Sequence, residues 1–152
     1  MNKGVAAIKK DKETILGIIR DIYALNSFVN FCGIEIEDID YGSVVLGLTI
    51  DGQKHTNQSQ NAHGGVLAAL ADTALGVSAA TVAKRVVTSS LQMSFIKGIR
   101  AGERVTACGR ILSNDGKFIV IRCQVFDKKT LMAEGLATMV IVGEYENIPA
   151  DW

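Results

Sequence analysis

One segment constrains the fold more than any other part of this 152-residue chain. Residues 64–83 carry a single charged side chain, Asp72, and most of their other positions are Ala, Gly, Ser or Thr. An Asp in the middle of a membrane span costs roughly 2.5 to 3.5 kcal/mol, and such small residues contribute little to insertion. We therefore predict a helix buried in a protein core, ending around residues 82–84, rather than a membrane span.

Hydrophobic patterns predict a second helix and six strands around this segment. Apolar residues spaced by three and four indicate an amphipathic helix over residues 13–31. Alternating apolar positions and turn signals indicate two strands before the buried helix and four after it. Four sets of positions are expected to share a face: Val44, Leu46, Leu48 and Ile50; Val87, Ser89, Leu91, Met93 and Phe95; Ile119, Ile121, Cys123 and Val125; and Ala133, Ala137, Met139 and Ile141.

These elements predict an α+β architecture. A helix that is apolar on nearly every side must be wrapped, and an antiparallel sheet curled around it does this with the fewest elements. The sheet would keep a long open edge, a liability that pairing with a second copy removes. We expect one domain over residues 1–152 and at least a dimer.

Composition limits the partners. Apolar residues make up 48% and charged residues 21%, as in globular proteins, while 16 basic and 16 acidic side chains cancel. No overall positive field attracts nucleic acid or an anionic membrane, so neither is expected as a partner, and an anionic substrate must be held by local groups.

The cysteines and the N-terminus favour a cytoplasmic protein. Cys32, Cys108 and Cys123 lie far apart and form no CxxC pair, which suits structural thiols in a reducing compartment. The first thirty residues begin polar and lack the pattern of a signal peptide.

Asp72 is the first candidate for chemistry. At helical spacing it shares one face with small residues only: Gly65, Ala68, Ala69, Gly76 and Ala79. Such a face lets a ligand or a neighbouring backbone approach the acid. A buried carboxylate needs a partner or raises its pKa, so Asp72 calls for either a structural partner or a function.

The start of the helix is the second candidate. His63-Gly64-Gly65 precedes it, so the amides of both glycines should be among the unpaired N–H groups there. They could bind a developing oxyanion, or the glycines could simply form a helix-initiating turn. No Gly-Lys-Ser or Gly-Lys-Thr follows to make a nucleotide-binding loop.

Other sites are not supported. The only histidines, His55 and His63, match no common zinc spacing, so no metal site is expected, and the chain lacks a Gly-x-Ser-x-Gly elbow. Basic residues flank the strand after the buried helix, and they could be a solvated rim or contacts for the phosphates of a nucleotide carrier. They are Lys84, Arg85, Lys97 and Arg100.

Four pieces of sequence taken together carry a family resemblance. They are His55-Thr56-Asn57, His63-Gly64-Gly65, Leu70-Ala71-Asp72 and the segment from Val87 to Phe95. With the segment at residues 28–34, they resemble the phenylacetate-degradation (PaaI-like) type of hotdog thioesterases, within the 4-hydroxybenzoyl-CoA thioesterase superfamily. The resemblance extends from about residue 27 to 142, and the hotdog core is expected over about residues 32–145.

The resemblance implies an acyl-CoA thioesterase whose two active sites form across a dimer interface, with further assembly into tetramers. It implies that Asp72 is the base or nucleophile and that the Gly64 amide polarises the thioester carbonyl. Asn57 and His63 would position the water or the substrate, and Thr88 would supply a hydroxyl near the water. Further substrate contacts are expected at Gly65, Ser89, Asn61, Ala68 and Arg85.

One departure and two rival functions remain. Gln60 stands where the family commonly has Gly, so the loop backbone could run differently, and Asn61 is then a second candidate for the role of Asn57.

The rival functions are an acyl-CoA-binding hotdog protein without catalysis and a hotdog hydratase or dehydratase. Regulators of the first kind carry a DNA-binding domain, for which the first 26 or so residues are expected to be too few. A thioester needs a base, a polarised carbonyl and exclusion of solvent, so no cofactor is expected beyond the coenzyme A of the substrate.

Overall fold

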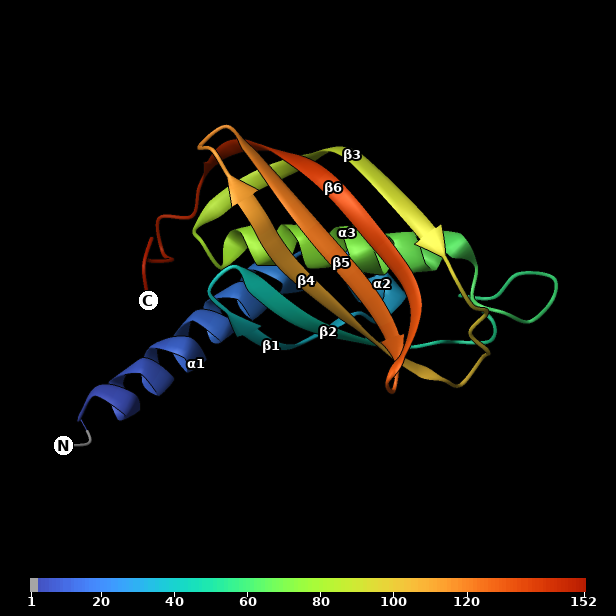
Figure 1. The fold of residues 1–152 in the computed structure, drawn as a ribbon. Helices are drawn as coiled ribbons and strands as arrows, with labels where there is room; N and C mark the ends of the chain where they lie inside the picture. Colours follow the sequence, from blue (N-terminus) through green and yellow to red (C-terminus); the bar gives the residue numbers. More distant parts are fainter. Residues whose placement is uncertain (1–2) are drawn as a thin grey trace.

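A six-stranded antiparallel sheet curls around one central helix (Figure 1). The structure is a computed structural model that describes the backbone of residues 3–152 and the side chains of residues 11–152. The elements in chain order are α1 (Lys3–Ala24), α2 (Ser27–Cys32), β1 (Glu35–Asp40), β2 (Ser43–Thr49), α3 (Gly64–Ala80), β3 (Lys84–Phe95), β4 (Arg104–Asn114), β5 (Phe118–Asp127) and β6 (Thr130–Glu144).

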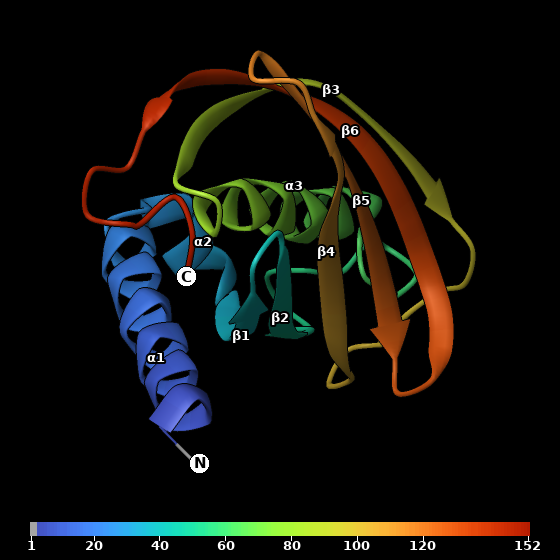
Figure 2. The same cartoon turned by 60° about the vertical axis from the view of Figure 1, so that its left-hand side comes forward.

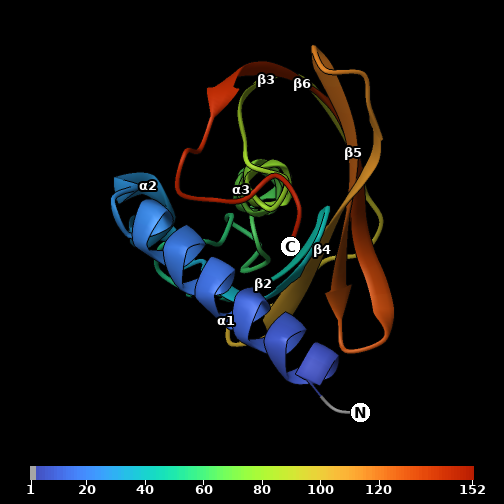
Figure 3. The ribbon, with the colours of Figure 1, turned by 90° about the vertical axis from the view of Figure 1, so that its left-hand side faces the viewer.

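The central helix is α3, as the sequence predicts. Seen along its axis, the sheet covers one side and the top of α3, while α1 and α2 lie on the other side (Figure 3). The helix ends at Ala80, slightly before the expected end, because Thr81 caps it and Ala83 takes a left-handed φ of 61°. The indole nitrogen of Trp152 donates to the carbonyl of Thr81 at 2.7 Å, so the C-terminal segment is fastened to this end of the helix.

The concave face of the sheet forms the core with α3. The sheet order is β1-β2-β4-β5-β6-β3, and every neighbouring pair is antiparallel. The expected inward positions of β2 and β5 are almost fully buried, which confirms those faces. Burying such branched side chains contributes about 1.5 to 3 kcal/mol each. No helix within residues 3–152 has the length and hydropathy needed to cross a membrane.

The single helix expected over residues 13–31 is two helices. Asn26 leaves the helical conformation with φ −84° and ψ 99°, and its side-chain oxygen accepts a hydrogen bond from the Val29 N–H at 3.0 Å. It thereby caps α2, the role for which Asn is favoured. Figure 2 shows α1 and α2 as two separate helices, with α1 beside β1. The apolar spacing of three and four residues continues across this break, so the sequence pattern does not reveal it. Leu25 and Phe28 belong to that pattern but are exposed in the structure.

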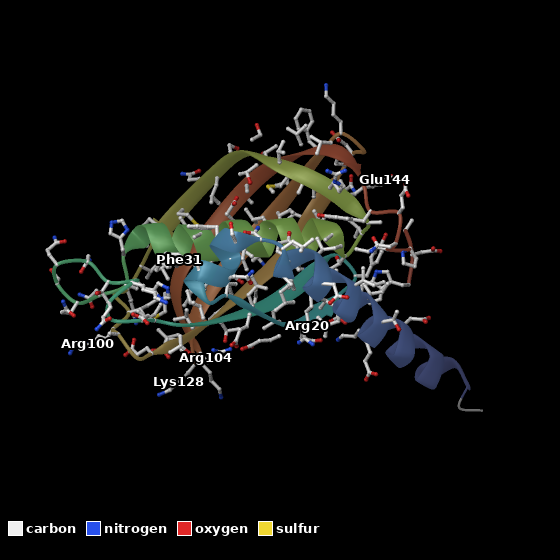
Figure 4. The ribbon with its side chains drawn as sticks, turned by 180° about the vertical axis from the view of Figure 1, so that it is seen from behind. Arg20, Phe31, Arg100, Arg104, Lys128 and Glu144 are labelled. Carbon is white, nitrogen blue, oxygen red and sulfur yellow. The ribbon has the colours of Figure 1, made fainter. Side chains whose placement is uncertain are left out.

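The two edges of the sheet differ. β1 is short, has a register shift between Ile36 and Asp38, and is covered by Arg20 of α1, which donates twice to the carbonyl of Ile36 at 3.1 and 2.8 Å. Figure 4 shows Arg20 at this junction. β3, at the opposite edge, is twelve residues long and pairs on one side only, with β6.

The face expected along β3 is interrupted. The register to β6 shifts between Thr88 and Ser90, which leaves Ser89 as a bulge. Val87, before the bulge, is therefore turned outward and 51% exposed, while Leu91 and Met93, after it, pack partly on the core. Phe95 shares their face and is 54% exposed at the end of the strand. Alternation breaks at a bulge because the extra residue reverses the side-chain order.

Candidate active site

Asp72 and Thr88 are brought together by the bulge in β3. The Thr88 hydroxyl donates to a carboxylate oxygen of Asp72 at 2.6 Å. A bulge re-aims the side chains beside it, and here it directs Thr88 toward α3. The pair consists of a carboxylate held in one orientation by a hydroxyl, with a second carboxylate oxygen left to accept a proton.

Asp72 is exposed in this chain, whereas the sequence led us to expect a buried acid. Most of the stripe of small residues on α3 turns outward, beside the open edge of β3, although Ala79 at its far end is fully buried. Gly65 on the same stripe is exposed, and Ala68 is half-buried. The cost of burying a charge therefore does not arise in the single chain.

A pocket of about 200 Å³ lies beside Asp72 and Thr88. Three parts of the chain form it: the N-terminal helices, α3, and the strands β3 and β6. In Figure 4, α2 lies across the front of α3, on the side of this pocket. The remaining lining residues are Tyr23, Asn26, Phe28, Val29, Ala69, Thr73, Gly76, Val86 and Met139.

His63 organises the start of α3. Its Nδ1 accepts a hydrogen bond from the Gly65 N–H at 2.8 Å, so the amide of Gly65 is not free, contrary to the expectation for both glycines. Because Nδ1 is the acceptor, the neutral ring carries its proton on Nε2, which points outward as a donor. For the Gly64 N–H, we find no acceptor within the described part of the chain, residues 3–152.

Gly64 lies under an aromatic ring. A Cβ atom at this position would be 3.3 Å from the ring of Phe95 at the end of β3, closer than comfortable van der Waals contact. The absent side chain leaves the Gly64 amide accessible beside that ring, which suits the approach of a carbonyl.

The loop before His63 is held by Asn57. Its side-chain oxygen accepts from the backbone N–H groups of Ser59 at 2.9 Å and Asn61 at 3.2 Å, and the side-chain amide of Asn61 donates to the Ser59 carbonyl. Gln60 has φ 60°, the left-handed conformation that Gly adopts without strain. The loop thus keeps the glycine-like backbone despite Gln60, and the NH₂ group of Asn57 is left to donate.

His55 supports this loop from inside. It is 4% exposed, its Nδ1 accepts from the Asp51 N–H at 2.9 Å, and its carbonyl accepts from the His63 N–H at 2.7 Å. Its Nε2 is buried and has no hydrogen-bond partner among the described residues. His55 therefore fixes the path from β2 to α3.

The two groups of residues stand apart in one chain. Gly64 and Asp72 are eight residues apart on a straight helix, which is about 12 Å of rise at 1.5 Å per residue. An oxyanion donor must lie about 3 Å from the carbonyl oxygen, and a base must lie within one water of the carbonyl carbon. One chain therefore presents two candidate half-sites, one at His63 and Gly64 and the other at Asp72 and Thr88.

Comparisons with known proteins agree with this architecture. The family model described as the thioesterase superfamily (4HBT) matches residues 59–134, half of the chain, and the matched segment contains Gly64, Asp72 and Thr88. The chain belongs to the thioesterase superfamily. It is 30% identical over 90 residues to the acyl-coenzyme A thioesterase PaaI of Escherichia coli, a match that spans 59% of this chain and 64% of that enzyme, less than two thirds of its length.

Solved structures share the fold of this superfamily member. The PaaI protein of E. coli, from the phenylacetic acid degradation operon, superposes with a TM-score of 0.82 at 22% identity, over 88% of this chain and 96% of that one. The protein smu.793 of Streptococcus mutans, solved with acetyl CoA bound, gives 0.71 at 20% identity, over 74% and 91%. The hotdog fold and the PaaI-like resemblance expected from the sequence are confirmed.

The remaining predicted contacts are dispersed. Ser89 is the exposed bulge residue next to Thr88. Arg85 is exposed near the start of β3, where its side chain passes over Gly143, and Lys84 pairs with Glu144. Neither basic residue lines the pocket beside Asp72.

Sequence reasoning missed the contribution of the N-terminal helices. Tyr23, Asn26 and Phe28 line the pocket, whereas the apolar spacing over residues 13–31 predicts only an amphipathic helix. The signal that could have found them is the Asn at position 26, because a strong N-cap residue inside an apolar pattern indicates a break.

The cysteines of this superfamily member are not activated nucleophiles. All three are free, and burial raises the pKa of each thiol, to about 12 for Cys123. A reactive cysteine needs the opposite shift. Within the described residues, no three His, Cys, Asp or Glu side chains come together in a way that could hold a metal ion.

Proposed function

We propose that this protein hydrolyses acyl-CoA thioesters to a free acid and coenzyme A, with no further cofactor. The observation that carries the proposal is the Asp72 carboxylate, fixed by the Thr88 hydroxyl at 2.6 Å beside a pocket, in a chain of the thioesterase superfamily. Two proteins of similar sequence or fold support the substrate class: one is named an acyl-coenzyme A thioesterase, and the other was solved with acetyl CoA.

Asp72 acts on the thioester as general base or as nucleophile. As a base, it takes a proton from a water whose oxygen attacks the carbonyl carbon; the carbon–sulfur bond then breaks, and the departing sulfur takes up a proton. Thr88 holds one carboxylate oxygen, so the other faces the reaction. Single turnover in heavy-oxygen water separates the two roles, because nucleophilic attack leaves labelled oxygen in the enzyme.

The start of α3 supplies the groups that polarise the carbonyl. The Gly64 N–H stands at the positive end of the helix, where developing negative charge is favoured. The Nε2–H of His63 and the NH₂ of Asn57 are further donors that could hold the water or the substrate. The loop contacts of Asn57 and His55 hold these groups in place before substrate arrives.

Two copies of the chain complete each site. The half-site at Gly64 is too far from Asp72 of its own chain, and β3 is the open edge beside both. Antiparallel pairing of β3 with its copy would bring the Gly64 half-site of one subunit toward the Asp72 half-site of the other. We therefore propose a homodimer with two composite sites, assembling further into a tetramer, and Arg85 on the same edge as a contact for the CoA phosphates.

The first test follows release of free thiol from aromatic and aliphatic acyl-CoAs. Asp72→Asn is compared with native protein, and Asp127→Asn, at the end of β5, is the matched control. We expect turnover of at least one ester by native protein and the control, and a loss of roughly a hundredfold or more in kcat for Asp72→Asn. Cleavage that survives Asp72→Asn would reject the site. Binding without cleavage by native protein would reject the enzyme in favour of an acyl-CoA-binding protein.

A further inference from the structure

The pocket beside Asp72 continues along α3 to a tyrosine of α1. Ala69, Asp72, Thr73 and Gly76 of α3 line it from one side, and Tyr23 closes it from the other. A Cβ atom on Gly76 would lie 2.7 Å from the Tyr23 hydroxyl oxygen. The hydroxyl therefore rests against the helix one turn beyond the carboxylate, in a space that only Gly leaves open.

The Tyr23 hydroxyl has an unused hydrogen-bonding capacity. The residue is partly buried against the core, and we find no hydrogen bond from its hydroxyl among the described residues. Burial raises the pKa of Tyr23 well above its usual range, with smaller contributions from Tyr145 and from Asp72. The hydroxyl thus stays protonated and can donate. Polar atoms in such positions are normally satisfied by protein, water or ligand.

We propose that this pocket holds the acyl group of the substrate and that Tyr23 is a specificity-determining residue, closing the pocket and hydrogen-bonding a polar group at the far end of the acyl chain. The inference rests on the proposed thioesterase function, because Asp72 is taken to mark the position of the thioester. The occupant is a short acyl group whose end carries a hydroxyl or another hydrogen-bonding group.

The dimensions of the pocket set the length of that group. From Asp72 to Gly76 the helix rises about 6 Å, which four or five carbon–carbon bonds of about 1.5 Å span along a zigzag. The volume of about 200 Å³ agrees, because a cavity of about 150 Å³ holds one benzene molecule. An acyl group of roughly four to six carbons therefore reaches Tyr23, and a ten-carbon chain does not fit without displacing it.

The test compares substrates that differ at one end only. Native protein, Tyr23→Phe and Tyr23→Ala are assayed by thiol release with hexanoyl-CoA, 6-hydroxyhexanoyl-CoA and decanoyl-CoA. Tyr145→Phe is the matched control, because it removes the hydroxyl of a neighbouring tyrosine that does not line the pocket. Each variant is first shown to match native protein in circular dichroism and in oligomeric state.

We expect Tyr23→Phe to lower kcat/KM at least tenfold for 6-hydroxyhexanoyl-CoA and less than threefold for hexanoyl-CoA, since only the first loses a hydrogen bond. We expect Tyr23→Ala to raise the decanoyl to hexanoyl ratio at least tenfold, and Tyr145→Phe to keep both ratios. Equal losses on the two six-carbon esters would mean that Tyr23 is only structural. If native protein turns over acyl-CoA but both Tyr23 variants keep its ratios of kcat/KM between substrates, this inference alone is overturned. If native protein turns over no acyl-CoA, the inference is overturned together with the proposed function.

Discussion

Mixing two inactive variants should restore activity, because in the proposed dimer each site takes residues from two chains. Asp72→Asn removes the carboxylate half-site and leaves the start of α3 intact. Gly64→Val damages the other half-site: its Cβ alone would be 3.3 Å from the Phe95 ring, so the branched side chain must displace that ring and occupy the space of the carbonyl. Each variant alone is expected to lose activity in both of its sites.

The recovered activity follows from counting sites. Random exchange of equal amounts gives heterodimers in about half of the molecules. In a heterodimer, one site combines both damaged halves and the other combines the native Gly64 of one chain with the native Asp72 of the other. Half of the sites in half of the dimers are native, so the mixture should reach about a quarter of native activity. This expectation rests on the rise of about 12 Å between Gly64 and Asp72 within one helix, which keeps the two residues of one chain from acting on the same thioester.

The assay is thiol release before and after the subunits are exchanged by mild denaturation and refolding. Chains that differ in tag mass let native mass spectrometry count the heterodimers, and the double variant Gly64→Val/Asp72→Asn mixed with native chain is the control. In that control the heterodimer has no intact site, so activity should fall to about a quarter. Heterodimers that form without any gain in the first mixture would refute the composite site.

Three further outcomes are expected. Thr88→Val should lower kcat about tenfold without unfolding the chain, because it removes a hydrogen bond to a charged carboxylate; steady-state kinetics and a thermal melt measure this, and an unchanged kcat would exclude a role for the hydroxyl. Gln60→Gly should stabilise the fold by about 1 kcal/mol, raising Tm by roughly 2 to 4 °C, because Gln60 has φ 60°; a lower Tm would show that the Gln side chain contributes more than the strain costs. Cys123 should react with iodoacetamide at pH 8 more than a hundredfold more slowly than in unfolded chain, since a thiol with its pKa raised to about 12 is almost wholly protonated there; rapid labelling of native protein, followed by mass spectrometry, would contradict this.

The fold was largely predictable because its strongest signals are local. The apolar segment that became α3 and the alternating positions of β2 and β5 depend on burial alone, and the structure buries them as expected. Two features escaped because they depend on single residues inside a continuous pattern. Asn26 ends one helix and caps the next, and the bulge at Ser89 shifts the face of β3.

The candidate site was predictable in its residues but not in its arrangement. Spacing along the chain led to Asp72 and to Gly64. The structure adds that Thr88 donates to Asp72 and that His63 accepts a hydrogen bond from the Gly65 amide. Exposure of Asp72 could not be foreseen, because the sequence does not tell which side of α3 the sheet leaves open. The residue roles, the dimer and the cytoplasmic location stay predictions.

The unequal edges of the sheet also bear on how the chain avoids runaway polymerisation. A sheet with two open edges can add copies at both ends, as fibrils do. Here Arg20 and the register shift block β1, so growth can proceed from β3 alone. In the proposed dimer, in which two copies join through β3, both ends of the joined sheet are blocked β1 edges, and the sheet does not grow further edge to edge. A substitution at Arg20 would therefore lower the solubility of the protein without changing any residue of the candidate site.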